Sequence, residues 1–219
     1  MKKITLVILF LLFSIQSFAQ LQDSLLYGFR LGITAHPNFG FMRAADGNSN
    51  GATLGFTYGL IGDFNFAERL SFSTGLTISS INGKTTERNA NFPESDPTAI
   101  YDLKYMMRYI EIPISVKFKT DKIGKLKWYG QLGLSNDFKI RARQDIRMGN
   151  KLIADQINSG AWTRFYRVGW ILGGGLEYDV IDHTSLLLGL SLNKGFTNIS
   201  TGKSKVKNNT VGIHLGLLF

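Results

Sequence analysis

Hydrophobic and polar residues alternate along most of the chain with a period of two rather than 3.6. Side chains of a β-strand point to opposite faces in turn, so this period predicts strands with one apolar and one polar face. No helical pattern separates the alternating segments, and we therefore predict an antiparallel sheet. The eight expected strands cover residues 27–34, 54–66, 70–79, 109–118, 128–137, 167–178, 186–193 and 211–219.

The connections between these strands alternate in length. Long connections are expected at residues 39–52, 83–102, 140–163 and 195–207, and short turns at residues 67–69, 120–125 and 181–185. Long and short connections then emerge at opposite ends of the sheet, as in outer-membrane barrels with long extracellular loops and short periplasmic turns. The predicted fold is all-β, an eight-stranded antiparallel transmembrane β-barrel. Residues 89–97 would lie outside the cell and residues 67–69 in the periplasm.

The main alternative is a secreted lipocalin-type barrel, which has an apolar interior and a charged exterior. Here the polar face is mostly Gly, Ser and Thr with one or two charges per strand, which suits a narrow lumen. Aromatic residues of the apolar face gather beside the short turns, as in the girdle at a lipid–water boundary. These residues are Phe64, Phe66, Phe72, Phe118, Trp128, Tyr178 and Phe219.

Residues 1–19 are predicted to be a signal peptide. Two lysines precede an apolar run at residues 4–13, which is too short to cross a bilayer as a helix. Small residues at Ser17 and Ala19 place cleavage after Ala19, and the alternative is an uncleaved anchor. The barrel domain would then occupy residues 20–219, and the expected localisation is the bacterial outer membrane.

Composition excludes several kinds of chemistry. The chain has no cysteine, which excludes disulfides, thiolate zinc sites and cysteine nucleophiles. With 24 glycines, 4 prolines and many aromatic residues, it favours twisted strands over helix bundles. The net charge is +9, but the basic residues fall in loops of an exported barrel and do not indicate nucleic-acid binding.

Four motifs stand out along the chain: YIEIPI with the following KF at residues 109–118, WYGQLGL at 128–134, GGGLEY at 173–178 and GFTNI at 195–199. They resemble motifs of the PorT-like (porin-family) outer-membrane β-barrel proteins. The last five residues, LGLLF, also resemble the C-terminal signal by which outer-membrane barrels are recognised for insertion. The resemblance covers nearly all of residues 20–219 and implies a barrel. Some family members are accessory factors of the type nine secretion and gliding machinery.

Charged residues on the polar face are expected to fill the lumen as a structural network. Its members are Arg30, Asp63, Glu111, Lys117, Glu177 and His214. Arg30 and Asp63 lie on adjacent strands at similar depth, and we predict that they pair, because an isolated charge in a narrow lumen lacks compensation. The alternative is an ion or proton path. Pro113 removes one donor from its strand and predicts a bulge or a locally open pairing.

Basic residues beyond the strands are candidates for binding the phosphates of lipopolysaccharide in the outer leaflet. They are Lys139, Arg141, Arg143 and Arg147, which alternate outward, and Lys203, Lys205 and Lys207 in the last long loop. The alternative is a solvated surface that aids solubility.

No catalytic, cofactor-binding or metal-binding residues are expected. His36 lies near the outer end of its strand, His183 in a short turn and His214 in the lumen. No two histidines share a spacing that suits a metal, and no serine is placed to make a His–Ser pair for lipid hydrolysis.

The sequence predicts a monomeric, non-enzymatic barrel with a structural or interaction role through its extracellular loops. Its partners would be outer-membrane lipids, lipopolysaccharide and, during biogenesis, the barrel-insertion machinery. One alternative is a small pore or an accessory component of a secretion machinery. Another is an outer-membrane lipid-modifying enzyme.

Overall fold

The computed structural model describes residues 28–45, 47–88, 90, 92, 95–96, 98–181, 183–201 and 205–219. The predicted signal peptide lies outside these residues. The elements are β1 (Phe29–Ala44), β2 (Gly47–Ser49), β3 (Thr53–Ala67), β4 (Leu70–Arg88), β5 (Ile100–Lys119), β6 (Leu126–Met148), β7 (Lys151–Asn158), a 3₁₀ turn η2 (Gly160–Trp162), β8 (Tyr166–Ile181), β9 (Thr184–Gly195) and β10 (Val206–Leu218). A search of the described residues finds no helix long and apolar enough to cross a membrane.

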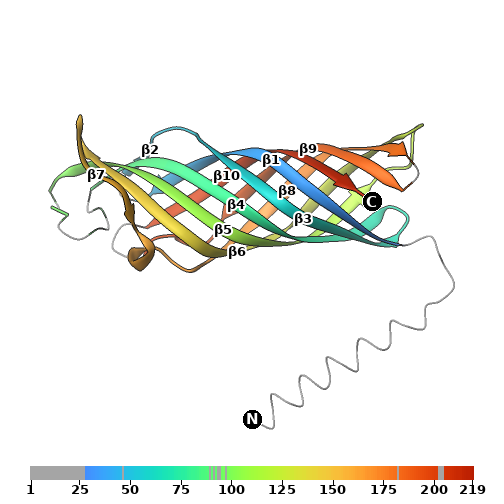
Figure 1. Cartoon of the computed structure of the whole chain (residues 1–219), viewed down its shortest axis with the longest axis horizontal. Coiled ribbons are helices and arrows are strands. Elements are labelled where there is room, and N and C mark those ends of the chain that lie inside the picture. The colour runs from blue at the N-terminus through green and yellow to red at the C-terminus, as the bar shows by residue number, and fades with distance from the viewer. Residues whose placement is uncertain are drawn as a thin grey trace, which may run out of the picture.

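The strands close into a barrel (Figure 1). Around the barrel the order is β1, β3, β4, β5, β6, β8, β9 and β10, and β10 pairs with β1 to complete the ring. All of these pairings are antiparallel, so the predicted eight-stranded antiparallel barrel is confirmed. β2 and β7 are additions that pair with β4 and β6.

Long and short connections emerge at opposite ends, as predicted (Figure 1). The short-turn end holds the β3–β4, β5–β6 and β8–β9 turns, together with the start of β1 and the end of β10. We call the opposite end the long-connection end.

The predicted long connections at residues 39–52, 83–102 and 140–163 are wrong in extent, because strands occupy much of them. The fourth, at residues 195–207, is confirmed, since β9 ends at Gly195 and β10 begins at Val206. β1 continues to Ala44 and β4 to Arg88, and β5 already begins at Ile100. β6 runs for 23 residues and then turns into β7. The barrel is therefore much taller than the predicted strands, and the extra height lies at the long-connection end.

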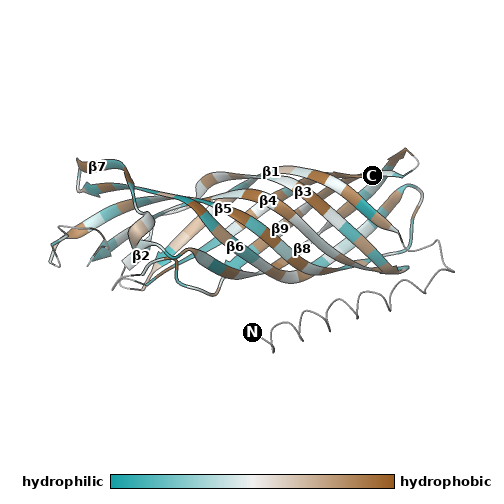
Figure 2. Ribbon diagram, turned by 60° about the horizontal axis from the view of Figure 1, so that its bottom comes forward, coloured by the Kyte–Doolittle hydropathy of each residue, from teal (hydrophilic) through white to brown (hydrophobic). Residues whose placement is uncertain are grey.

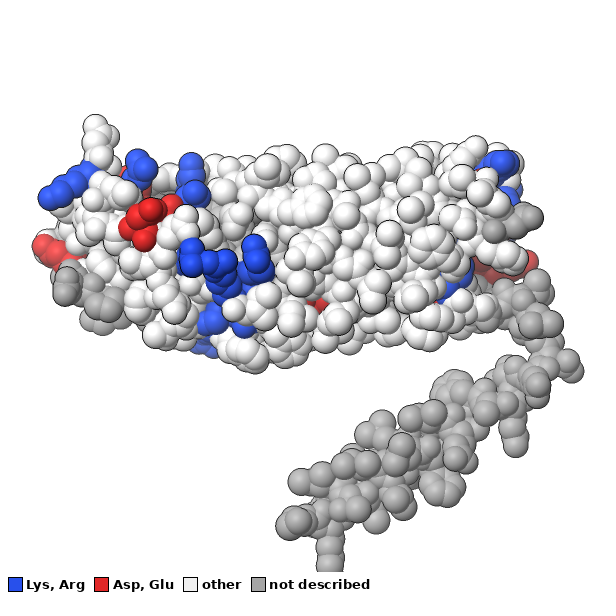
Figure 3. Space-filling view, viewed as in Figure 1, with Lys and Arg blue, Asp and Glu red and all other residues white. Residues whose placement is uncertain are grey.

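The reason for the error is that the apolar face of the strands changes from the outside to the inside of the barrel along its height. In the part nearer the short-turn end apolar side chains point outward, and Leu60 is 49% and Leu190 62% exposed. Towards the long-connection end the apolar side chains point inward, and Leu103 is 1% exposed. Since polar residues there face water, the sequence reads as a loop although the backbone stays extended. Figure 2 shows the brown residues in the barrel wall, and the face in Figure 3 is almost free of charge across its middle.

The interior of the long-connection end is an apolar core. Its buried residues include Met42, Ile81, Tyr101, Leu103, Tyr105, Met107, Tyr109, Ile146, Ile199 and Val206. This core fills the barrel where the wall rises above the uncharged belt. The same stretches carry charged residues on their outer faces, for example Lys84 and Lys104.

Two prolines interrupt the ladder without changing its register. Between β1 and β10 the pairing stops after Thr34–Gly216 and resumes at Asn38–Gly212, a gap that contains Pro37. Between β4 and β5 it stops at Thr74–Ile114 and resumes at Thr77–Glu111, a gap that contains Pro113. The locally open pairing predicted at Pro113 is thus confirmed.

Threonine hydroxyls reach carbonyl groups in both gaps. The hydroxyl of Thr34 donates to the carbonyl oxygen of Leu215 at 2.6 Å, and that of Thr74 donates to the carbonyl oxygen of Pro113 at 2.8 Å. An unpaired carbonyl in a membrane-facing wall costs free energy, so these hydroxyls offset the loss of ladder bonds.

Candidate functional site

A layer of buried ion pairs crosses the lumen near the short-turn end. Lys117 Nζ lies 2.6 Å from Asp63 Oδ2, and the two side chains are 3% and 0% exposed. Lys119 Nζ bridges Asp63 Oδ2 at 3.7 Å and Glu177 Oε2 at 3.8 Å. Arg30 pairs with Glu177 and donates to Ser185 Oγ at 2.6 Å. Three cations and two carboxylates from four strands therefore meet in one layer across the barrel.

The predicted pair of Arg30 and Asp63 is wrong in its partners. The two residues are directly opposite in the β1–β3 ladder, as their depth suggested. The Arg30 guanidinium nevertheless reaches Glu177 on β8, and the Asp63 carboxylate is bound by Lys117 of β5. A narrow lumen lets long side chains cross it, so neighbours in the wall need not be partners in the interior.

Small residues make room for the large ones in this layer. The Lys117 ammonium lies 5.2 Å from the centre of the Tyr129 ring. Opposite that ring, a Cβ on Gly189 would lie 2.5 Å from Tyr129 Oη and 2.6 Å from the carbonyl oxygen of Gly174. Gly189 therefore leaves the space that the Tyr129 side chain occupies.

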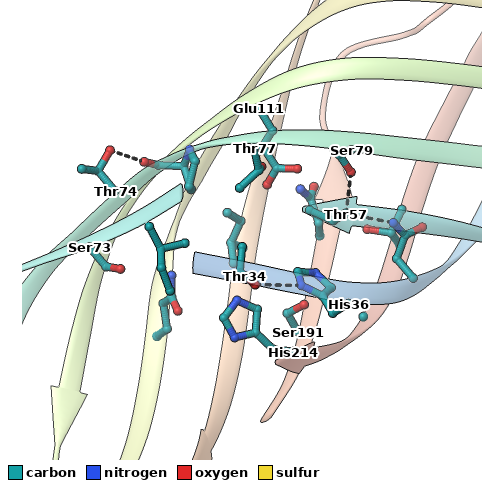
Figure 4. Close-up of a pocket in the computed structure, with 18 of the residues that line it drawn as sticks. Thr34, His36, Thr57, Ser73, Thr74, Thr77, Ser79, Glu111, Ser191 and His214 are labelled. Atoms are coloured by element: carbon teal, nitrogen blue, oxygen red, sulfur yellow. Dashed lines mark hydrogen bonds between the residues drawn. The ribbon is translucent and has the colours of Figure 1, made fainter. Parts of the chain in front are cut away.

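Above the ion pairs lies a polar chamber of about 80 Å³ (Figure 4). His36 of β1 and His214 of β10 lie side by side on its wall, because their strands are neighbours, and their ring centres are 4.8 Å apart. His36 Nδ1 is 3.2 Å from Thr34 Oγ1, whereas the buried His214 Nδ1 has no hydrogen-bond partner among the described residues. Glu111 also lines the chamber, two residues above Pro113 on β5.

The expectation that His36 lies near the outer end of its strand is therefore wrong. β1 extends beyond it to Ala44, so His36 stands inside the lumen at mid-strand and is 7% exposed. His183 lies in the β8–β9 turn and lines a separate surface pocket at the short-turn end. The described residues hold no group of three or more His, Cys, Asp or Glu side chains placed to bind a metal ion.

A second ionic layer closes the chamber from above. Arg167, 1% exposed, is paired with Asp137, which is its direct partner in the β6–β8 ladder. The Arg167 guanidinium also donates to Asn193 Oδ1 at 3.0 Å and to the carbonyl oxygen of Asn208 at 3.3 Å. Sequence reasoning did not include Arg167 and Asp137 in the network. Both lie on the polar faces at the ends of predicted strands 128–137 and 167–178, so the alternation already placed them toward the lumen.

A buried carboxylate, that of Glu87, lies in the apolar core above this layer. Glu87 Oε1 accepts hydrogen bonds from Thr85 Oγ1 at 2.5 Å and from Tyr105 Oη at 3.0 Å. Burial, followed by the charge and hydrogen bond of Glu87, raises the pKa of the Tyr105 phenol well above its usual range. Tyr105 therefore remains a hydrogen-bond donor at any physiological pH.

The basic candidates divide into two groups. Lys139 was predicted to point outward, but its ammonium lies inside and donates to the carbonyl oxygens of Gly160 at 2.8 Å and Thr163 at 2.5 Å. It therefore anchors the η2 turn. Arg141, Arg143, Arg147, Lys205 and Lys207 lie on the outer surface at the long-connection end, and Lys203 lies outside the described residues.

A β-bulge separates Lys139 from the arginines that follow. Tyr109 of β5 pairs with Lys139, and the next residue of β5, Arg108, pairs with Arg141. Ile140 is the extra residue, and it is 49% exposed. An insertion of one residue reverses the facing of everything after it. The sequence pattern gave no signal for this reversal. Lys139, Arg141 and Arg143 are two residues apart, so an unbroken strand would place all three on the same face.

The barrel is closed, with an apolar, uncharged belt outside and paired charges inside. Strand pairing around the ring, with threonine hydroxyls in the two proline gaps, satisfies the backbone as crossing a lipid bilayer demands. The fold is thus that of an outer-membrane β-barrel and not of a lipocalin-type barrel. The chain belongs to the outer membrane protein beta-barrel domain family, whose model matches residues 18–201.

Solved structures of outer-membrane barrels are similar to this chain at low sequence identity. Neisserial surface protein A matches at 15% identity and a TM-score of 0.47, over 86% of this chain and 95% of the other. OprG from Pseudomonas aeruginosa matches at 12% identity and a TM-score of 0.46, over 88% and 97%. No curated protein matches the sequence.

Proposed function

We propose that this protein is a closed, non-enzymatic outer-membrane barrel that acts through the surface of its long-connection end, which faces the cell exterior. The observation that carries the proposal is the stacking of three seals in the lumen. These are the Lys117–Asp63 layer, the Arg167–Asp137 layer and the apolar core around Leu103. An eight-stranded barrel leaves only enough interior for side chains, so paired charges in it act as a plug.

Conductance of the purified protein in planar lipid bilayers tests the closed lumen. The intact protein should give no discrete conductance steps. Lys117→Ser and Arg167→Ser remove one cation from each ionic layer, and Leu103→Ser with Tyr105→Ser opens the apolar core. The four changes together should produce steps, which shows that the assay detects an opened barrel. Discrete steps from the intact protein would contradict the proposal.

The polar chamber between the two ionic layers supports a second candidate, a small pore or an accessory component of a secretion machinery. Its volume of about 80 Å³ and its polar lining offer a place for water inside the barrel. Some members of the PorT-like family that the sequence resembles are accessory factors of type nine secretion, so this is the machinery to test. Loss of secreted proteins in a deletion strain, together with conductance by the intact barrel, would favour this candidate.

Lipid hydrolysis has less support from the positions of the histidines. His36 and His214 lie side by side inside the lumen, away from the leaflet in which a lipid substrate would lie. Analysis of lipid A composition with and without the protein tests this possibility. Unchanged lipid A is the expected result.

Export by a cleaved signal peptide, residues 1–19, is part of the same proposal. The mature N-terminus should be Gln20, which N-terminal sequencing of protein isolated from outer membranes checks. A chain that retains its first residues would instead support an uncleaved anchor.

A further inference from the structure

Three arginines form a cluster on the outer wall where the uncharged belt ends. Arg108 of β5 and Arg141 of β6 are directly opposite in the ladder, and Arg143 follows two residues further on the same face. All three line one surface groove of about 230 Å³ together with Gln156 of β7. Figure 3 shows a patch of Lys and Arg at this edge of the white belt. Arg108 was missed by sequence analysis because it falls between the predicted long connection at residues 83–102 and the predicted strand at residues 109–118.

The cluster carries positive charge that the protein itself does not balance. Within the described residues, none of the three guanidiniums forms an ion pair, and Arg143 donates to the neutral Gln156 Oε1 at 2.6 Å. Like charges directly opposite in a ladder destabilise a sheet. An anion from outside the chain would turn this repulsion into attraction.

Higher on the same two strands, charges of both signs are mixed. Lys104 Nζ lies 3.7 Å from Asp145 Oδ2, and Asp102 is the ladder partner of Arg147. Such a mixture of positive and negative side chains is what a surface needs for solubility alone. On these two strands the unbalanced cluster is therefore confined to the level at which the wall leaves the lipid.

Neighbouring residues fix that level. Below Arg108 the next outward residue of β5 is Ile110, and below the bulge the outward residue of β6 is Phe138. The Phe138 ring packs against Phe165 and Tyr166 with ring centres 6.0 and 5.2 Å apart. Aromatic side chains gather at the lipid–water boundary, so the arginines stand at the depth of lipid headgroups.

We propose that Arg108, Arg141 and Arg143 bind the phosphate groups of lipid A in the outer leaflet. Guanidinium groups bind phosphate through paired hydrogen bonds, and three of them around one groove match the two phosphates of a bisphosphorylated glycolipid. The bulge at Ile140 is what points Arg141 and Arg143 at the lipid. The inference rests on the proposed outward orientation of the long connections but not on the closure of the lumen.

Native mass spectrometry of the detergent-purified protein with bisphosphorylated lipid A tests the proposal. The intact protein should retain lipid A, and R108Q/R141Q/R143Q should reduce the bound fraction at least tenfold. Lipid A stripped of its phosphates should bind the intact protein as weakly as the variant binds the phosphorylated form. The triple lysine variant, which keeps the charge and loses the paired geometry, should bind between the two.

R43Q/K205Q/K207Q is the matched control, because it removes three positive charges from another surface at the same end. It should retain lipid A as the intact protein does. An equal loss in both triple variants, or equal binding of phosphorylated and dephosphorylated lipid A, would overturn the proposal. Displacement of lipid A by millimolar inorganic phosphate would assign the site to free phosphate and would also overturn it.

The two proposals fail separately. Binding is measured in detergent, where orientation and conductance play no part, and a heat-dependent gel shift verifies that each variant is a folded barrel. A conducting barrel that still binds lipid A through the arginines would remove the closed-lumen function and leave this inference in place.

Discussion

Individual charges in the lumen are held by partners that come from distant parts of the chain. Alternation in the sequence shows that Asp63 and Lys117 face inward, but it does not show that they meet. Their contact depends on the register of three strands and on which long side chain crosses the lumen. This is why the set of lumen-facing charges is largely readable from the sequence, whereas the pairing of Arg30 with Glu177 is not.

The Lys117–Asp63 contact should be strongly coupled. Lys117→Met leaves a buried carboxylate with weaker compensation and should cost about 3–5 kcal/mol of stability. Adding Asp63→Leu should recover part of this loss, because both charges are then gone. Urea unfolding in lipid vesicles measures the double-mutant cycle.

The cycle of Arg30→Met with Asp63→Leu is the control for this coupling. Its interaction energy should be clearly smaller, since Arg30 is paired with Glu177 instead. Equal coupling energies in the two cycles would contradict this prediction. They would show that Asp63 interacts with Arg30 as strongly as with Lys117.

Strands in this barrel are single elements that pass through two environments. β5 presents Ile112 and Ile114 outward in the belt, and further along it buries Leu103 and Tyr105 instead. The alternation with an apolar outer face identifies the part of each strand that lies in lipid. Beyond the belt the outer face is polar and the apolar residues are on the other face, so the pattern resembles a loop. The full lengths of β1, β4, β5 and β6 could therefore not be predicted from the sequence.

Deleting Ile140 should collapse the alternation of β6 beyond the bulge. Residues 141–147 would shift by one position, which would bring Arg141 and Arg143 inward and move Ala142 and Ile146 out of the apolar core. We expect a large drop in the urea midpoint of the folded barrel. Ile140→Ala keeps the residue count and should unfold close to the midpoint of the intact protein, and a similar drop in both variants would argue against a role for the bulge.

The orientation of the barrel in the membrane can be tested at the turns of its two ends. Gly149 in the β6–β7 turn and Gly124 in the β5–β6 turn are exposed, and both have positive φ, of 58° and 64°. An epitope tag inserted after Gly149 should be detected on intact cells. A tag after Gly124 should be detected only once the outer membrane is broken, and the reverse pattern would show that the barrel is inserted the other way round.

The length of β6 determines which part of the protein an approaching particle meets first. A tilted strand crosses a bilayer in about 9–11 residues, whereas β6 has 23. The remaining residues, at about 3.3 Å each and a tilt of about 40°, carry the hairpin roughly 30 Å beyond the lipid. A bacteriophage or an antibody that approaches the cell would then touch the tip around Gly149 before it touched any sugar close to the membrane. Sequence variation between strains should for that reason concentrate at this tip and not in the sealed interior beneath it.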